Sequence, residues 1–248
     1  TALPIHYEGA TRTRRFSYDV HSEMYPAQPK CEKVAAGRGL RAKYYEKPFF
    51  LCEYAHAMGV GAGDLERYVK AFYSSDIMMG GCIWEFADHA VYHENGDYKY
   101  TYGGDHGEWK HDSNFCVDGL FNADRTPHTG AVQMKNCYRP IRARHKENDI
   151  FEFTSKSYFK THKCTVKYSV LKNGVEAESG EFELEIEPTR TVAQKIDYSV
   201  NHHTVIVFNY FDGEKHIARE QIVLSEDYRT EPIAESEAPK VSNSERKL

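Results

Sequence analysis

The chain has 248 residues, of which 40% are hydrophobic and 9 are proline, so it is long enough for one large or two ordinary globular domains and is not a disordered protein. Its net charge is −5 and its lysines and arginines are scattered, which argues against the basic face that nucleic-acid binding requires. No stretch approaches the ~20 apolar residues of a membrane span, so we expect neither a nucleic acid nor a membrane as partner.

Short apolar runs alternate with helical or irregular stretches up to about residue 140. The runs are, in order, LPIHYEG at 3–9, YDVHSEMYP at 18–26, FFLCEYAHAMG at 49–59 and GGCIWEFADHA at 80–90. Between the last two, Leu65, Tyr68, Val69 and Phe72 recur at helical spacing, and Asp64 is placed to cap that helix. This alternation predicts parallel strands with helical crossovers.

The hydrophobic period changes to two from about residue 145 onward. Five runs alternate apolar and polar residues: DIFEFTS, CTVKYSVLKNGVEAES, EFELEIEP, HTVIVFNYF and EQIVLS. Asn173 followed by Gly174 is a strong signal for a hairpin turn. We therefore expect a small antiparallel β-sandwich over residues 141–226. The last residues, 227–248, are polar with few aromatic residues and are predicted to be a linker or tail.

The six cysteines are spread widely, and none forms a C-x-x-C pair. Cys52, Cys82 and Cys116 lie within apolar runs, which favours reduced, buried thiols over a disulfide framework or a zinc site. Reduced thiols are typical of a reducing compartment, so we expect a cytoplasmic protein. No signal peptide is visible, but the first residues, TALPIHYEG, look like the middle of a domain, and we expect further chain upstream.

Glutamates follow three of the four candidate parallel strands, at Glu8, Glu53 and Glu85. In a closed β/α barrel the active-site residues come from the C-terminal ends of the strands, so glutamates at that position face one pocket. Paired carboxylates with aromatic side chains are what glycoside hydrolysis requires. Each glutamate taken alone could equally cap loop amides or pair with an arginine. Glu53 differs because Tyr54 and His56 follow it, and these side chains can orient a carboxylate or bind a hydroxyl-rich substrate.

Four segments together carry a resemblance to a known family: LCEYAHAMG, GGCIWEFADHA, YGGDHGEWKHDSNFCVDGL and ADRTPHTG. In this order and spacing they resemble the C-terminal half of the catalytic barrel of the large bacterial β-galactosidases, members of glycoside hydrolase family two. The resemblance implies that residues 1–140 are the C-terminal half of a (β/α)8 TIM barrel. By order and texture, residues 141–226 resemble the immunoglobulin-like antiparallel β-sandwich that follows the barrel in that family.

The resemblance also implies roles for individual residues. Glu53 corresponds to the nucleophile of a retaining mechanism, and Tyr25 to the tyrosine that hydrogen-bonds it. His56 corresponds to a ligand of a galactose hydroxyl, and Trp84 to an aromatic wall of the galactose pocket.

A cation site is implied at Phe115 and Asp118. They fall where the family places a backbone carbonyl and a side-chain ligand for a monovalent cation, usually sodium, which also contacts the sugar. The best-known form has asparagine where this chain has Asp118, and asparagine where it has Val60. A carboxylate is a legitimate ligand for a hard cation and adds a negative charge. The Mg²⁺ ligands and the acid/base glutamate of the family correspond to sequence upstream of the matched region.

The expected function is retaining hydrolysis of terminal β-D-galactosyl residues in β-galactosides such as lactose. A complete barrel needs about eight strand-helix units and roughly 250 residues, so we expect the chain to be inactive alone. It would need the missing N-terminal part of the barrel and the flanking domains as partners, and a homo-oligomer is left open. Two alternatives remain: a relative with another sugar specificity, such as a β-glucuronidase or β-mannosidase, and a noncatalytic sugar-binding or scaffold fragment.

Overall fold

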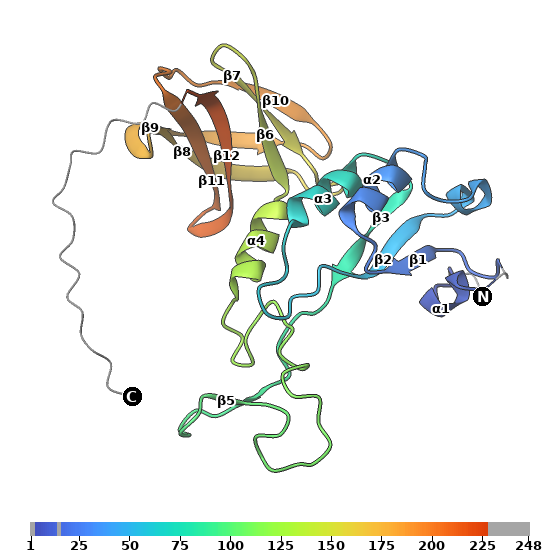
Figure 1. The fold of residues 1–248 in the computed structure, drawn as a ribbon. Coiled ribbons are helices and arrows are strands. Elements are labelled where there is room, and N and C mark those ends of the chain that lie inside the picture. The colour runs from blue at the N-terminus through green and yellow to red at the C-terminus, as the bar shows by residue number, and fades with distance from the viewer. Residues whose placement is uncertain (1–2, 14–15, 228–248) are drawn as a thin grey trace. The chain divides into compact units, whose positions relative to one another are not determined.

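The chain divides into two compact units, residues 1–139 and 140–248 (Figure 1). The computed structural model describes residues 3–13 and 16–227, so the predicted tail lies outside the described residues except for Asp227. Across these described ranges, no helix has the length and apolar character needed to cross a membrane.

The first unit contains a parallel three-stranded sheet in the order β1-β2-β3. Its strands are β1 (His21–Met24), β2 (Phe49–Tyr54) and β3 (Met78–Ile83). The chain crosses from β1 to β2 through α2 (Gln28–Ala35) and the 3-10 helix η1 (Ala42–Glu46), and from β2 to β3 through α3 (Leu65–Tyr73). The prediction of parallel strands joined by helical crossovers is confirmed for these three strands.

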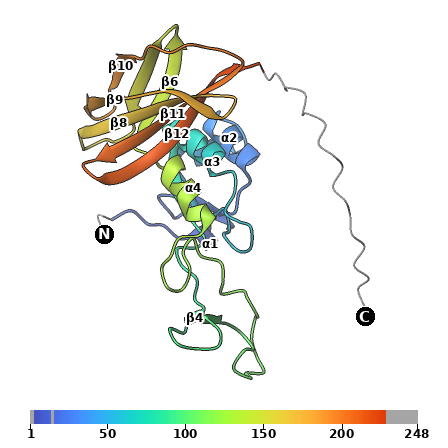
Figure 2. The same cartoon turned by 90° about the vertical axis from the view of Figure 1, so that its left-hand side faces the viewer.

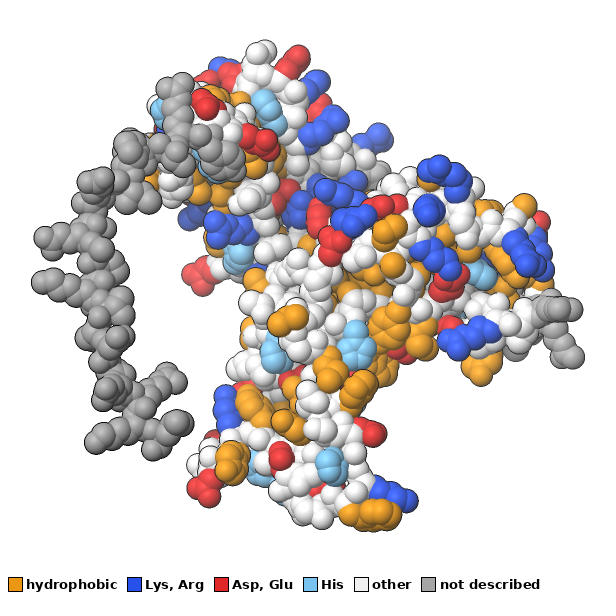
Figure 3. Space-filling model, in the orientation of Figure 1, with side chains coloured by type: hydrophobic (Ala, Val, Ile, Leu, Met, Phe, Trp, Pro, Cys, Tyr) orange, Lys and Arg blue, Asp and Glu red, His pale blue; other side chains and the backbone are white. Residues whose placement is uncertain are grey.

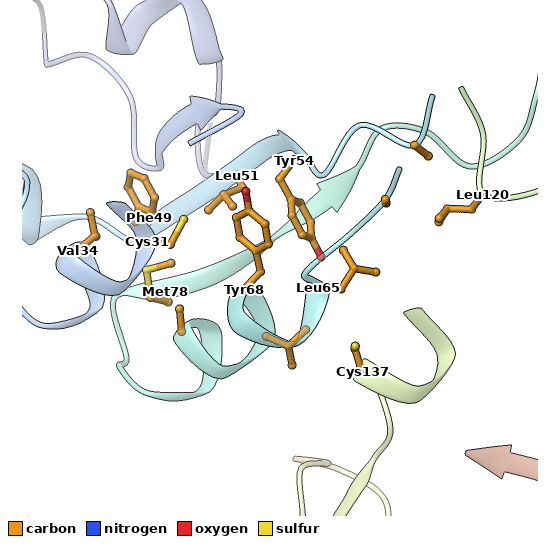
Figure 4. Close-up of a cluster of buried hydrophobic side chains, with 14 of the residues drawn as sticks. Cys31, Val34, Phe49, Leu51, Tyr54, Leu65, Tyr68, Met78, Leu120 and Cys137 are labelled. Carbon is orange, nitrogen blue, oxygen red and sulfur yellow. The ribbon is translucent and has the colours of Figure 1, made fainter. Parts of the chain in front are cut away.

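The core of this unit lies between the sheet and the helices α2 and α3 (Figure 4). Phe49 and Leu51 of β2 are fully buried, whereas Cys52 and Glu53 are only half-buried, because the helices cover one face of the sheet. Helix α3 begins after Asp64, as predicted, but the Asp64 side chain makes no capping hydrogen bond. Its carboxylate instead lies 3.4 Å from Arg67 on the helix surface.

A long excursion connects β3 to α4 (Thr129–Cys137). Within it, β4 (Val91–Tyr92) and β5 (Tyr100–Thr101) form a small antiparallel pair that extends away from the three-stranded sheet in both views (Figures 1 and 2). The chain then returns toward the sheet before α4. This return path brings the motifs NFCVDGL and ADRTPHTG back beside the end of β3.

The predicted strand in LPIHYEG is wrong. The Ile5 N–H donates to the Asp19 side chain and the Asp19 N–H donates to the Ile5 carbonyl, each over 2.7 Å, so Ile5 pairs with a single residue 14 positions away rather than with a strand. The short helix α1 (Glu8–Thr11) begins at Glu8, which therefore does not end a strand. Its carboxylate lies 2.8 Å from Arg12, one helical turn onward.

All six cysteines are free, but their burial differs from the prediction. Cys82 is exposed, and Cys52 and Cys116 are half-buried. An apolar run forms a fully buried strand only where both faces of the sheet are covered, and here helices cover one face. Burial instead raises the pKa of the thiols of Cys31 and Cys164 to about 11.

The second unit consists of two antiparallel sheets, ordered β10-β7-β6 and β12-β11-β8-β9. Its strands are β6 (Ile141–Glu147), β7 (Ile150–Ser155), β8 (His162–Lys172), β9 (Val175–Ile186), β10 (Thr191–Lys195), β11 (His203–Asp212) and β12 (Lys215–Glu226). The Asn173-Gly174 turn joins β8 to β9, and both residues have positive φ, as the hairpin prediction requires.

Two of these strands were absent from the sequence-based prediction. β6 and β10 are rich in charged and polar residues, which weakens the alternating signal. The two sheets meet through aromatic side chains, with the Phe208 ring 5.5 Å from Phe151 and 5.2 Å from Phe153, both edge to face. These three side chains are fully buried, so aromatic packing joins the sheets.

We expect Phe208→Ala to lower the free energy of unfolding of this unit by about 3–5 kcal/mol, because the substitution leaves a cavity between the sheets. Urea unfolding of the 248-residue chain, followed by circular dichroism, measures the loss. Phe159→Ala is the matched control, since Phe159 is 98% exposed, and should change stability by less than about 0.5 kcal/mol. Equal losses in the two variants would contradict the packing described here.

Candidate active site

Glu53 lies at the C-terminal end of β2, where the neighbouring strand holds it from one side. The Tyr25 backbone N–H, just after β1, donates to the Glu53 carbonyl over 2.8 Å. Tyr25 has a positive φ of 51°, an uncommon conformation for a bulky residue that turns the chain at this point. The Tyr25 hydroxyl lies beside the Glu53 carboxylate. Burial, and then the interaction with Glu53, raises the pKa of Tyr25 above its usual value, so the hydroxyl keeps its proton and is available as a donor.

His56 follows β2 and lies between Tyr25 and Asp118. Its ring centroid is 5.7 Å from that of Tyr25 and 6.4 Å from that of Phe115. Nδ1 of His56 accepts a 3.3 Å hydrogen bond from the Met58 backbone N–H, so in the neutral ring the proton resides on Nε2. That Nε2 lies 3.7 Å from Asp118 Oδ2 and can donate toward a ligand between them.

Asp118 is buried, with 3% of its surface exposed, and its two oxygens have different surroundings. Oδ2 accepts a 3.1 Å hydrogen bond from the indole N–H of Trp84, which follows β3. Oδ1 is buried and accepts no hydrogen bond from the described part of the chain. A buried carboxylate oxygen is costly unless a donor or a cation reaches it. The geometry therefore fits a ligand or a hard cation at Oδ1.

A monovalent cation suits this donor set, because Oδ1 of Asp118 is a hard oxygen with no other partner described. Phe115 lies three residues earlier in the same turn, and its ring is exposed. Within residues 3–13 and 16–227 there is no group of three or more His, Cys, Asp or Glu side chains arranged to hold a metal ion. A site here would therefore use backbone carbonyls besides the carboxylate.

Glu85 lies beside Asp118, although the family resemblance assigned it no role. Its backbone N–H donates to the Asp118 carbonyl over 2.9 Å. Partial burial, and then the adjacent Asp118 carboxyl, raises the pKa of Glu85. His89 Nε2 lies 3.3 Å from the Glu85 carboxylate and opposes that shift.

The structure thus joins all six residues that the sequence singled out. Direct contacts link Glu53, Tyr25, His56, Phe115, Asp118 and Trp84 into one cluster at the C-terminal edge of the sheet. Val60 is fully exposed in the loop after His56 and makes no part of these contacts in the described residues. Sequence reasoning missed the pair formed by buried Asp88 and partly exposed His128, whose carboxylate oxygen and Nε2 are 3.0 Å apart.

Comparison with known proteins shows to which family the chain belongs. Residues 1–143 match the family model described as the TIM barrel domain of glycosyl hydrolases family 2. The chain is 35% identical over 216 residues to a beta-galactosidase of Actinobacillus pleuropneumoniae, covering 83% of this chain and 20% of that protein. It is 42% identical over 146 residues to a beta-galactosidase of Staphylococcus xylosus, covering 56% and 14%. A solved Bacteroides uniformis β-glucuronidase aligns with 84% of this chain and 26% of its own, at 14% identity and a TM-score of 0.32.

Parallel strands with carboxylates at their C-terminal ends, within a matching TIM barrel model, place the first unit in the class of barrel-type glycoside hydrolases. The chain belongs to glycosyl hydrolases family 2. The family resemblance found in the sequence is confirmed. The chain spans about a fifth or less of the length of these two beta-galactosidases.

Trp84→Phe should destabilise the first unit by about 1–3 kcal/mol, because Asp118 then keeps its burial and loses its indole donor. Urea unfolding by circular dichroism measures this, since it does not depend on tryptophan fluorescence. Trp109→Phe is the matched control, as Trp109 is 85% exposed. The hydrogen bond carries no net stability if both variants unfold at the same urea concentration.

Proposed function

We propose that the complete protein is a β-galactosidase that hydrolyses terminal β-D-galactosyl residues of β-galactosides such as lactose, with retention of configuration. The observation that carries the proposal is Glu53 at the end of β2, with the Tyr25 hydroxyl beside its carboxylate. The relatives named beta-galactosidase, 35% and 42% identical to this chain, support the sugar specificity.

The proposed architecture is the C-terminal half of a (β/α)8 barrel over residues 1–140, followed by an immunoglobulin-like sandwich over 141–226. In the described part of the chain, the outer strands β1 and β3 each pair on one side only, which suits a sheet that continues with further strands. Hydrophobic side chains are visible on the surface of this unit (Figure 3). Met79 of β3 and Phe86 just after it are more than 60% exposed, and apolar surface of this kind fits a partner segment.

In the proposed mechanism Glu53 is ionised and attacks the anomeric carbon. The bond from that carbon to the glycosidic oxygen breaks, and a carboxylic acid contributed by another part of the complete protein protonates the departing oxygen. The same acid, now a base, removes a proton from water, which attacks the anomeric carbon and releases Glu53 and galactose. Tyr25 holds the carboxylate in place and stabilises its charge against desolvation.

The remaining residues of the cluster are proposed to bind the sugar. His56 and Asp118 offer a donor and an acceptor to galactose hydroxyls, and Trp84 offers an aromatic face. Asp118 and the Phe115 carbonyl would hold Na⁺ or another monovalent cation, which when bound supplies positive charge beside the sugar. Mg²⁺, also proposed from the resemblance, would be held by other parts of the complete protein. The free thiols support a reducing, cytoplasmic location.

Glu53→Gln in the complete enzyme should lower kcat by several orders of magnitude, because it removes the nucleophile and keeps the shape. A 2-deoxy-2-fluoro galactoside with a good leaving group should form a stable glycosyl-enzyme, and mass spectrometry of the digested protein should locate the label in FFLCEYAHAMG. Glu8→Gln is the matched control, since Glu8 pairs with Arg12, and it should remain active.

Labelling of Glu8 or Glu85 together with full activity of Glu53→Gln would overturn the assignment. A panel of chromogenic glycosides decides between galactoside, glucuronide and mannoside as substrate. The 248-residue chain alone should neither turn over galactosides nor accumulate the adduct. Galactose binding without turnover by the complete protein would instead favour a noncatalytic binding role.

Asp118→Ala in the complete enzyme should raise KM for galactosides and weaken the dependence of activity on Na⁺, because the buried oxygen that meets cation or sugar is gone. Steady-state kinetics over a range of Na⁺ concentrations measures both. Asp118→Asn keeps one oxygen and should retain a cation response. The cation site is wrong if wild type is equally active without added cation and the alanine variant behaves as wild type.

A further inference from the structure

The segment that carries Asp118 is neither helix nor strand, so something else must fix the position of its carboxylate. Residues 116–121 run beside residues 85–89 and are joined to them by backbone hydrogen bonds. The Glu85 N–H donates to the Asp118 carbonyl and the Leu120 N–H to the Glu85 carbonyl, each over 2.9 Å. The bond from Glu85 holds the carbonyl end of the Asp118–Gly119 peptide and leaves the N–H end of that peptide to another acceptor.

Asp88 holds that peptide bond. Oδ1 of Asp88 accepts a 2.8 Å hydrogen bond from the N–H of Gly119, the residue directly after Asp118. Oδ2 accepts from Nε2–H of His128, at 3.0 Å, immediately before helix α4. The Asp88 side chain is only 4% exposed, so both of its oxygens are occupied in a site away from water.

Gly119 is held by contact as well as by this bond. A Cβ on Gly119 would lie 2.2 Å from the Asp88 backbone nitrogen and 2.3 Å from the Ala87 carbonyl carbon, so no side chain fits. The two backbones therefore meet directly, and the orientation of the 118–119 peptide follows the position of Asp88.

The other side of the 114–119 segment is open. A pocket of about 350 Å³ borders it, lined by Asn114, Val117 and Gly119 together with His128 and the loop from Ala57 to Gly61. Side-chain packing therefore does not restrain the segment from that side. The restraint comes from the backbone hydrogen bonds to residues 85–89 and, at the Gly119 N–H, from Asp88, whose other oxygen accepts from His128.

We infer that Asp88, oriented by His128, is a positioning residue for Asp118 through the N–H end of the Asp118–Gly119 peptide. This inference rests on the proposed function as far as activity is concerned. Asp88 acts through the Gly119 N–H and does not contact the sugar or the reacting atoms. His128 belongs to the motif ADRTPHTG, whose role the proposed mechanism leaves unassigned.

A spectroscopic test uses the 248-residue chain and does not depend on activity. The chain has two tryptophans, Trp84 and Trp109, so a ¹⁵N-indole spectrum contains one informative and one reference resonance. The Trp84 indole N–H donates to Asp118, so displacement of that carboxylate shifts its resonance. Asp88→Ala should shift the Trp84 indole signal and leave that of exposed Trp109 unchanged.

Conservative variants separate positioning from folding. Asp88→Asn should keep the wild-type Trp84 signal, because its oxygen still accepts from Gly119 and its amide donates to the other tautomer of His128. His128→Ala removes the hydrogen bond between His128 and Asp88 and keeps the bond from the Gly119 N–H, so it should give an intermediate shift of the Trp84 signal. The His128 side chain is 38% exposed. If Asp88→Ala does not fold, His128→Ala decides. An unmoved Trp84 signal in folded Asp88→Ala or His128→Ala would overturn the inference.

A double-mutant cycle tests the same link in the complete enzyme. Asp88→Ala should lower kcat/KM by roughly 10- to 100-fold, as displaced binding groups do. Asp88→Ala combined with Asp118→Ala should be no worse than Asp118→Ala alone, because Asp88 acts through Asp118. Asp124→Ala is the matched control: its carboxylate holds a neighbouring turn through Thr126 and Lys99, and its effect should add to that of Asp118→Ala.

The outcomes distinguish the two proposals. Additive effects of Asp88→Ala and Asp118→Ala would overturn the positioning role. An inactive wild-type enzyme would overturn the proposed function, and the Trp84 signal would still decide whether Asp88 positions Asp118.

Discussion

The pairing of β2 with a parallel neighbour on each side is the constraint on which the site depends. Parallel strands end at the same edge of a sheet, so residues far apart in the chain meet there. The backbone bond from Tyr25 to Glu53 and the 3.1 Å bond from Trp84 to the Tyr54 carbonyl continue the pairing beyond the strand ends. Backbone hydrogen bonds therefore fix the positions from which the side chains of the cluster contact one another.

Within the described residues, the carboxylates of Glu53, Asp118 and Asp88 lie beside neutral groups or histidine rather than arginine or lysine. Glu53 lies beside the Tyr25 phenol, Asp118 accepts from the Trp84 indole, and Asp88 accepts from a backbone amide and from His128. Each bond offsets part of the cost of desolvation without cancelling the negative charge. The positive charge that develops on the sugar ring in glycoside hydrolysis is stabilised by such uncancelled charge, so this choice of partners suits the proposed reaction. Beside Asp118, burial and then the neighbouring Asp118 carboxylate raise the pKa of Glu85.

The sequence predicts the strands whose signal is local. The apolar run at 49–54 and the Asn173-Gly174 turn need no knowledge of the rest of the chain, and both predictions hold. The run LPIHYEG has the same composition as a strand, but Ile5 within it pairs with Asp19, 14 residues away, and not with a strand. Whether Cys82 is buried depends on what covers the second face of the sheet, which composition does not reveal.

In the candidate site, too, some residues can be selected from the sequence and others cannot. Glu53 can be selected from sequence because its neighbours are unusual and because a family motif surrounds it. Asp88 cannot, since its partners lie 31 and 40 residues away and it occupies an ordinary position in an apolar run. The role of a buried carboxylate is identified from the donors of its hydrogen bonds, and only the folded backbone shows which groups these donors are. The resemblance places residues in the pocket but does not reveal how they are held there.

Gly119 limits which substitutions can be introduced into this segment by protein engineering. Residue 115 has room for variation, because the Phe115 side chain is 64% exposed, whereas residue 119 has no space for even one methyl group. Randomised libraries that span residues 115–119 would therefore lose most of their members to misfolding at a single codon. Libraries that fix glycine at 119 and vary its neighbours would instead sample changes in specificity.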